Sequence, residues 1–236
     1  MTTILLQFLL AHFLGDFVLQ ANKWVKDKEE KGLKSIYLWL HIGIHFLLMF
    51  VFTAFKIKLI PVIVAIGFSH LIIDVIKIKL KHRLPASYLF FGDQLLHLLI
   101  LVGALGIYFD INWISFLNPS EQWMIWILAF IMLTSVSAVI LKVALSKWDL
   151  KTFDGEALEK AGLYIGILER LFIFGFVVME YWAGIGFLIA AKSIFRFSDL
   201  SRSKDRKLTE YVLIGTLLSY GLAIVIALGA LWVLRQ

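Results

Sequence analysis

Long apolar segments alternate with short polar segments along the whole chain. Most of them approach the roughly 20 residues that an α-helix needs to cross the hydrocarbon core of a bilayer. Helix is the expected state, because an open sheet in lipid would leave the N–H and C=O groups of its edges unpaired. We therefore predict an all-α, polytopic transmembrane helical bundle of about eight spans, at residues 3–20, 36–55, 59–77, 86–109, 122–143, 161–179, 181–196 and 210–234.

The basic residues predict the orientation of these spans. Of the 23 lysines and arginines, 19 fall in or beside the connections after the first, third, fifth and seventh segments. Basic residues concentrate on the cytoplasmic side of membrane proteins, so these four connections are expected in the cytoplasm. With eight spans, both termini then lie outside.

The composition indicates a membrane protein and argues against a soluble domain or a nucleic-acid-binding protein. Hydrophobic residues make up 61% of the chain, charged residues 17%, and the mean hydropathy is +0.87. A soluble domain of this length cannot bury so much apolar surface. The net charge of +6 follows from the basic connections, so no nucleic-acid partner is expected. The chain has no cysteine, which excludes disulfides and thiolate metal ligands.

The first four predicted helices each carry one pair of ionisable residues spaced four apart. Residues at this spacing share one face of a helix. With the predicted orientation, all four pairs fall in the cytoplasmic half of the membrane, within a few helical turns of its surface. The pairs are His12 and Asp16, His41 and His45, His70 and Asp74, and Asp93 and His97.

Imidazole and carboxylate groups together are the usual protein ligands of Zn²⁺, Mn²⁺ and Fe²⁺. Buried ionisable groups in a span are costly and mark function. We therefore predict one or two divalent metal ions, with zinc favoured, bound among these eight residues, and Asp16 and Asp93 as candidate catalytic groups. The alternative is that the pairs form hydrogen bonds that only hold the helices together.

The chain divides into two predicted halves. Residues 1–109 form a four-helix bundle that bears the His/Asp pairs, and residues 110–236 form a second transmembrane half with a cationic cytoplasmic edge. In the second half, Glu169, Arg170, Lys192 and Arg196 are candidate substrate-binding residues that could hold a phosphate or carboxylate head group. Alternatively, they form an intramembrane ion pair, such as Glu169 with Arg170 or Lys192, together with ordinary basic anchors.

Six segments in order resemble a bacterial membrane family known only as domain of unknown function 3307. They are AHFLGDFVLQ, SHLIIDVIK, FGDQLLH, GILER, AAKSIFRF and EYVLIGTLLS. The resemblance implies a polytopic membrane protein and brings no established activity. Separately, SHLIID is similar to a motif of bacterial inner-membrane metal-dependent hydrolases. That similarity implies a metal role for His70 and Asp74.

These features favour a membrane-embedded, metal-dependent enzyme of the bacterial inner membrane. The expected reaction is hydrolysis of a lipid or lipid-linked, anionic substrate at the cytoplasmic side. A metal- or proton-coupled transporter is the first alternative, and would need a polar path to the outer face. A haem-binding membrane protein with axial histidines is the second.

Overall fold

The computed structural model describes residues 2–109, 122–147, 156–200 and 206–235. Its regular elements are all helices, and no β-strand occurs among the described residues. The predicted all-α class is therefore confirmed. The chain forms two compact units, Met1–Leu128 and Ala129–Arg235, and α6 (Gln122–Ile131) crosses the boundary between them.

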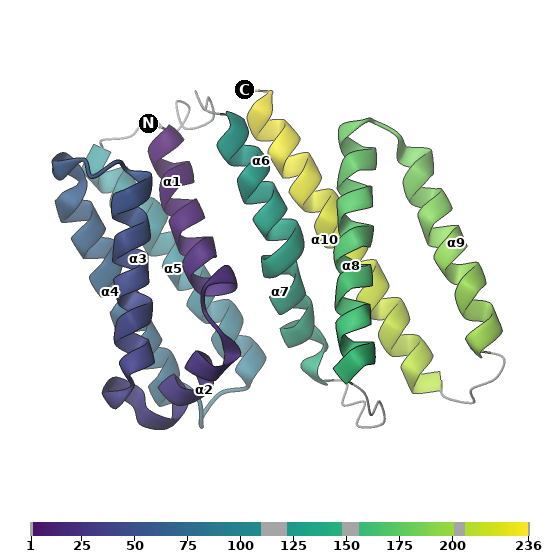
Figure 1. The fold of residues 1–236 in the computed structure, drawn as a ribbon, viewed down its shortest axis with the longest axis horizontal. Helices are drawn as coiled ribbons and strands as arrows, with labels where there is room; N and C mark the ends of the chain where they lie inside the picture. The colour runs from purple at the N-terminus through teal and green to yellow at the C-terminus, as the bar shows by residue number, and fades with distance from the viewer. Residues whose placement is uncertain (1, 110–121, 148–155, 201–205, 236) are drawn as a thin grey trace. The chain divides into compact units, whose positions relative to one another are not determined.

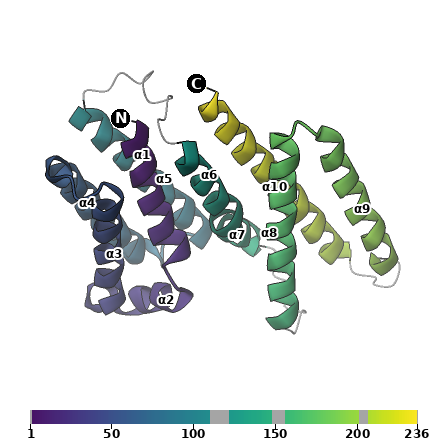
Figure 2. The same ribbon diagram turned by 45° about the horizontal axis from the view of Figure 1, so that its top comes forward.

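Unit 1 is a bundle of four long helices and one short polar helix. Figures 1 and 2 show α1, α3, α4 and α5 side by side, with α2 lying across the end of the bundle where α1 stops. The elements are α1 (Thr2–Phe13), a π-helical turn η1 (Leu14–Val18), α2 (Asn22–Lys31), η2 (Gly32–Lys34), α3 (Ile36–Phe52), η3 (Ile57–Leu59), α4 (Ile60–Leu80) and α5 (Ala86–Phe109).

The sequence explains the path of the chain around α2. Seven of its ten residues are charged, so α2 cannot continue the apolar span of α1, and the two segments are bent by 84°. Gly32 ends α2 with a φ of +57°, a conformation that glycine adopts without steric cost. This turn lets the chain re-enter the bundle as α3.

Unit 2 consists of helices that pack around α8 and α10. In this unit α8 contacts both α9 and α10, and α10 also contacts α7. The elements are η5 (Met132–Val136, a second π-helical turn), α7 (Ser137–Ala144), η6 (Leu145–Lys147), α8 (Glu156–Val178), α9 (Trp182–Leu200) and α10 (Arg206–Leu234).

The helices have the length and surface of a membrane bundle. By length and composition, five of the described helices could cross a membrane, or six if α1 and α2 count as one broken span. The segments Ile36–Phe52 and Trp182–Ile194 are apolar but shorter. Large apolar side chains also point outward, as at Leu47, Phe68 and Leu99, each 58% exposed. A water-soluble protein rarely exposes so many such side chains together.

An apolar core fills the half of unit 1 that lies farther from α2. The core comprises Phe8, Ala11, Met49, Leu59, Val62, Ile63, Ile66, Leu101 and Leu105. On each of the four long helices, these residues lie farther from α2 than the His/Asp pair of that helix does. The ionisable pairs therefore occupy one layer of the bundle, between the apolar core and α2.

Candidate metal centre

Four helices of unit 1 bring the eight predicted metal ligands into one cluster. Each pair faces the interior of the bundle, because its helix presents that face to its neighbours. The side chains of His12, Asp16, His41, His45, His70, Asp74, Asp93 and His97 are at most 7% exposed.

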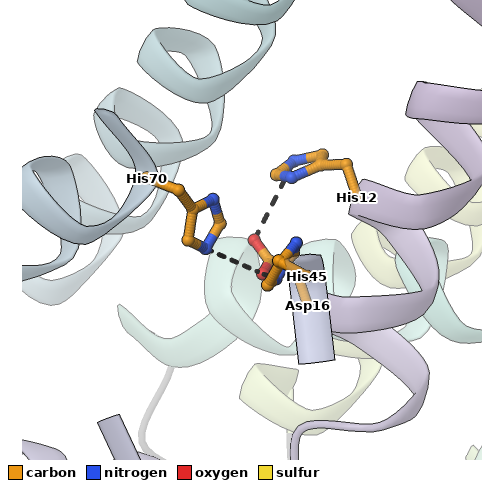
Figure 3. A group of neighbouring side chains, drawn as sticks. All are labelled: His12, Asp16, His45 and His70. Atoms are coloured by element: carbon orange, nitrogen blue, oxygen red, sulfur yellow. Dashed lines mark hydrogen bonds and ion pairs between the residues drawn. The ribbon is translucent and has the colours of Figure 1, made fainter. Parts of the chain in front are cut away.

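Asp16 lies at the centre of the first part of the cluster (Figure 3). Its Oδ1 atom is 2.9 Å from Nε2 of His45 and 3.5 Å from Nε2 of His70. Its Oδ2 atom is 3.9 Å from Nε2 of His12. One ligand atom from each of these four residues lies within 4.8 Å of the others. Ligands of a tetrahedral zinc ion lie about 3.4 Å apart, so the four side chains fit a single ion.

The other candidate ligands continue from this set. Asp74, Asp93 and His97 form a second group with one ligand atom each within 4.8 Å of the others, and His41, His70 and Asp74 form a third. Nε2 of His41 is 3.1 Å from Nε2 of His70, so the groups are continuous. The cluster therefore offers three overlapping places for an ion.

Several buried polar atoms of the cluster lack a hydrogen bond, although Nε2 of His97 lies 3.3 Å from Oδ1 of Asp93 and Nε2 of His12 lies 3.9 Å from Oδ2 of Asp16. Nε2 of His12, Nε2 of His97 and Oδ1 of Asp93 make no hydrogen bond to any described residue. Such atoms are rare in proteins, because leaving one buried and unpaired costs about 1–3 kcal/mol. The same region holds a cavity of about 10 Å³, lined in part by His12, His45, His70 and His97. A cavity of this size accommodates one water molecule.

A family comparison covers this part of the chain. Residues 4–125 match the model of a family described as a protein of unknown function, DUF3307, and this region is more than half of the chain. The chain belongs to the DUF3307 family. No curated protein and no solved structure matches the chain. All eight candidate ligands lie inside the DUF3307 region, as does nearly all of unit 1.

Two lysines of the DUF3307 region reach into the cluster, which the sequence analysis missed. Nζ of Lys28 donates to Oδ2 of Asp74 at 2.9 Å, and Nζ of Lys77 donates to Oδ2 of Asp93 at 2.6 Å. Lys77 lies three residues after Asp74 on the same helical face, a spacing that could have identified it. No sequence signal identifies Lys28, because its position depends on how α2 folds across the bundle.

Two glutamines also contact the centre and were missed. Nε2 of Gln94 donates to Oδ2 of Asp16 at 2.9 Å, and Nε2 of Gln20 is 3.1 Å from the ring nitrogens of His41. Gln20 lies four residues after Asp16, and Gln94 follows Asp93 directly. Contacts of this kind orient metal ligands in known sites.

The backbone next to Asp16 departs from an ordinary α-helix. Residues Leu14–Val18 form a π-helical turn, a feature often found at functional sites. Within this turn Gly15 is buried against the ring of His45. A larger residue at position 15 would occupy the space of the imidazole.

The candidate substrate-binding residues lie in unit 2, where two of them pair with each other. Nζ of Lys192 donates to Oε2 of Glu169 at 2.7 Å. Arg170, which is 2% exposed, donates to the carbonyl oxygens of Leu133 and Thr134 in the π-helical turn η5 and to Oγ of Ser219. The side chain of Arg196 lies outside the described residues. Binding of an anionic head group by these four residues stays a prediction.

Proposed function

We propose that this protein is a membrane-embedded, metal-dependent hydrolase that acts on a lipid or lipid-linked substrate. In this proposal the chain crosses the bacterial inner membrane eight times with both termini outside. The α2 side of unit 1 then faces the cytoplasm, as the distribution of basic residues favours. One observation carries the proposal: the side chains of His12, Asp16, His45 and His70 are at most 7% exposed, and one ligand atom from each lies within 4.8 Å of the others.

The ligand set supports one divalent ion, with zinc favoured. Three imidazoles and one carboxylate match the ligand types that zinc prefers, and Nε2 of His12 makes no hydrogen bond to a described residue. In the second group, by contrast, Lys28 and Lys77 already donate to Asp74 and Asp93. These two ammonium groups compensate the charge of the carboxylates and repel a cation that binds there. We therefore assign the ion to the first group.

The arrangement around the ion supplies the groups that hydrolysis needs. A bound divalent ion would polarise the scissile group and activate a water molecule. Asp93 is the better candidate for the general base. Lys77 and Gln94 hold its Oδ2 atom in place, while its Oδ1 atom makes no hydrogen bond to a described residue and lies 3.3 Å from Nε2 of His97. Asp16 contacts four histidines and Gln94, so we assign it the role of a metal ligand.

The apolar core favours hydrolysis over transport. A transporter needs a path that continues beyond the site toward the other face of the membrane. Here Phe8, Met49, Ile66 and Leu101 line the cavity beside the histidines, and more apolar side chains pack behind them. The side chain of Lys77 is 34% exposed, so the cluster meets the surface on the side away from this core.

Metal content is the test of this proposal. The full chain is purified in mild detergent without chelator and analysed by elemental mass spectrometry, together with the His70→Gln variant. His82→Gln is the matched control, because His82 is exposed in the turn after α4 and belongs to none of the metal-binding groups. We expect about one equivalent of zinc, manganese or iron in the wild type and in the control. The His70→Gln variant should contain less than a tenth of that amount.

Hydrolysis is then measured on the metal-loaded protein in nanodiscs, with a panel of carboxyl-ester and phosphoester lipids. Release of a product that disappears in His70→Gln and persists in His82→Gln supports the proposal. A folded wild type without metal would overturn it. A metal-loaded protein that cleaves none of these lipids would overturn the hydrolase function and leave the metal site standing.

A further inference from the structure

We infer that the substrate of this centre carries a phosphodiester group, and that Lys28 and Lys77 bind its charge. This inference rests on the proposed function and adds the class of substrate. The cluster and its two lysines contain five charged side chains. Asp16, Asp74 and Asp93 contribute three negative charges, and the two lysines contribute two positive charges.

The charge balance changes sign when an ion binds. Without an ion these five side chains sum to one negative charge, and together with one divalent ion they sum to one positive charge. An uncompensated charge is costly in the low-dielectric interior of a membrane protein. A bound ligand with a single negative charge would neutralise this positive charge. Phosphodiesters carry one negative charge at neutral pH, whereas phosphomonoesters carry nearly two.

The two lysines lie on the side of the cluster that is away from the apolar core, where a ligand from the surface would bind. Lys28 reaches the cluster from α2 and is buried, and Lys77 reaches it from the end of α4 and is partly exposed. Each ammonium group donates to an aspartate that lies outside the assigned ion site. An ammonium group has three N–H donors, so each lysine can keep its aspartate and also donate to a non-bridging oxygen of the phosphodiester. Charge-assisted hydrogen bonds of this kind bind phosphate strongly.

The surroundings of Lys77 suit a lipid head group. Its Nζ atom lies 6.0 Å from the centre of the Phe90 ring, and the ring of Phe17 packs edge-on against Phe90. Aromatic rings at this edge can contact the glycerol and upper acyl carbons of a lipid while the phosphate reaches the lysines. A phospholipid therefore fits better than a free phosphodiester, although both share the same charged group.

The reaction then follows from the positions of the residues. Asp93 takes a proton from the attacking water, whose oxygen forms a new bond to phosphorus. The bond between phosphorus and the leaving oxygen breaks, and Asp93 returns the proton to that oxygen. One water is consumed, and the products are a phosphomonoester and an alcohol. Lys28 and Lys77 hold the non-bridging oxygens throughout.

The test uses the full metal-loaded chain and four variants: Lys28→Gln, Lys77→Gln, Lys28→Arg and Lys81→Gln. The arginine variant keeps the charge. Lys81 is the matched control, because it lies near the end of α4 but contacts only Glu29 among the described residues. Binding of monomethyl phenylphosphonate, a monoanion that mimics a phosphodiester, is measured by thermal shift. Hydrolysis is measured on bis(p-nitrophenyl) phosphate and on phosphatidylglycerol in nanodiscs.

Loss of one charge-assisted hydrogen bond corresponds to roughly 10- to 100-fold weaker binding. We expect losses of this size for phosphonate in the two glutamine variants and wild-type binding in Lys28→Arg and Lys81→Gln, with metal content unchanged in all. Cleavage of phosphatidylglycerol supports a lipid substrate, and cleavage of the soluble diester alone supports a free one. If the metal-loaded protein cleaves only carboxyl esters, the phosphodiester inference is wrong and the hydrolase proposal survives. Absence of metal overturns both.

Discussion

A β-carbon on Gly15 would lie 2.5 Å from Cε1 and Nε2 of His45, closer than real side chains approach. The helical turn that carries Asp16 and the helix that carries His45 can therefore come together only because residue 15 has no side chain. The contact brings Oδ1 of Asp16 and Nε2 of His45 to 2.9 Å. The proposed metal site depends on this close approach.

Gly15→Ala should reduce metal binding without unfolding the protein. The methyl group displaces the imidazole of His45, and a displacement of about 1 Å is enough to misplace a metal ligand. We expect at least tenfold weaker metal binding, measured by competition with a chelator of known affinity. Gly43→Ala is the control, since a β-carbon there meets nothing within 4 Å although Gly43 lies between two ligands of α3. Equal metal affinity in the two variants would contradict the assignment of His45 as a ligand.

Gly67→Ala should destabilise unit 1 through its packing. A β-carbon at Gly67 would lie 2.2 Å from Cζ of Phe46, where α4 meets α3. Overpacking of this kind costs about 1–3 kcal/mol. We expect a lower midpoint of thermal unfolding, monitored by circular dichroism in detergent. Phe46→Leu should restore part of the loss in the double variant, and Gly103→Ala, with open space around it, should behave as the wild type.

Asp27 should make the stability of α2 depend on pH. Its carboxylate accepts hydrogen bonds from Lys31 and from Oγ of Ser35, and these two bonds lower the pKa of Asp27. A lowered pKa means that the carboxylate stabilises the folded state above the ordinary aspartate pKa of about 3.9. This contribution is lost as the pH falls through the lower pKa of the folded protein.

Hydrogen exchange of the α2 amides, expressed as protection factors, measures this effect. Asp27→Asn should reduce protection at neutral pH and should remove part of the decrease that the wild type shows in acid. Glu30→Gln, at an exposed position of the same helix, should follow the wild-type curve. Identical pH curves for Asp27→Asn and the wild type would show that Asp27 does not hold α2 in place.

Arg170→Ala should destabilise unit 2. The arginine donates to the carbonyl oxygens of Leu133 and Thr134 in the π-helical turn η5, and Thr134 also accepts from the backbone N–H of Ser137. Removing the guanidinium therefore leaves the Leu133 carbonyl without this donor. Unpaired buried carbonyl groups cost about 1–3 kcal/mol each. We expect a clear drop in the unfolding midpoint and only partial recovery in Arg170→Lys, because an ammonium group cannot reproduce the planar donors of a guanidinium. Wild-type stability with weaker substrate binding would instead favour the substrate role predicted from the sequence.

The spacing of residues along the helices was enough to predict which ionisable side chains gather in one cluster. Residues four apart lie on one face, and the structure accordingly has Nε2 of His97 3.3 Å from Oδ1 of Asp93 and the rings of His41 and His45 4.6 Å apart. The hydropathy pattern was likewise enough to predict that the protein is all-helical. Both patterns are local, so a single sequence contains them in full.

The parts that depend on the three-dimensional path of the chain could not be predicted. Lys28 looks like one more basic residue of a connection, and only the bend between α1 and α2 takes it to Asp74. Glu169 and Arg170 are neighbours in sequence, yet Glu169 pairs with Lys192 while Arg170 bonds to the backbone of η5. Nothing in the hydropathy pattern marks the two π-helical turns, each of which changes the direction of the side chains that follow.

The apolar core of unit 1 has an electrical consequence. The voltage across a membrane falls through its low-dielectric layer, and a full crossing changes the energy of one unit charge by about 2.3 kcal/mol per 100 mV. An ion that reaches the centre from the α2 side does not pass the core formed by residues such as Phe8, Ile63 and Leu105. It therefore senses only a small part of that voltage. If the proposed metal site is correct, its loading would follow the metal concentration on one side of the membrane, whether the membrane is energised or not.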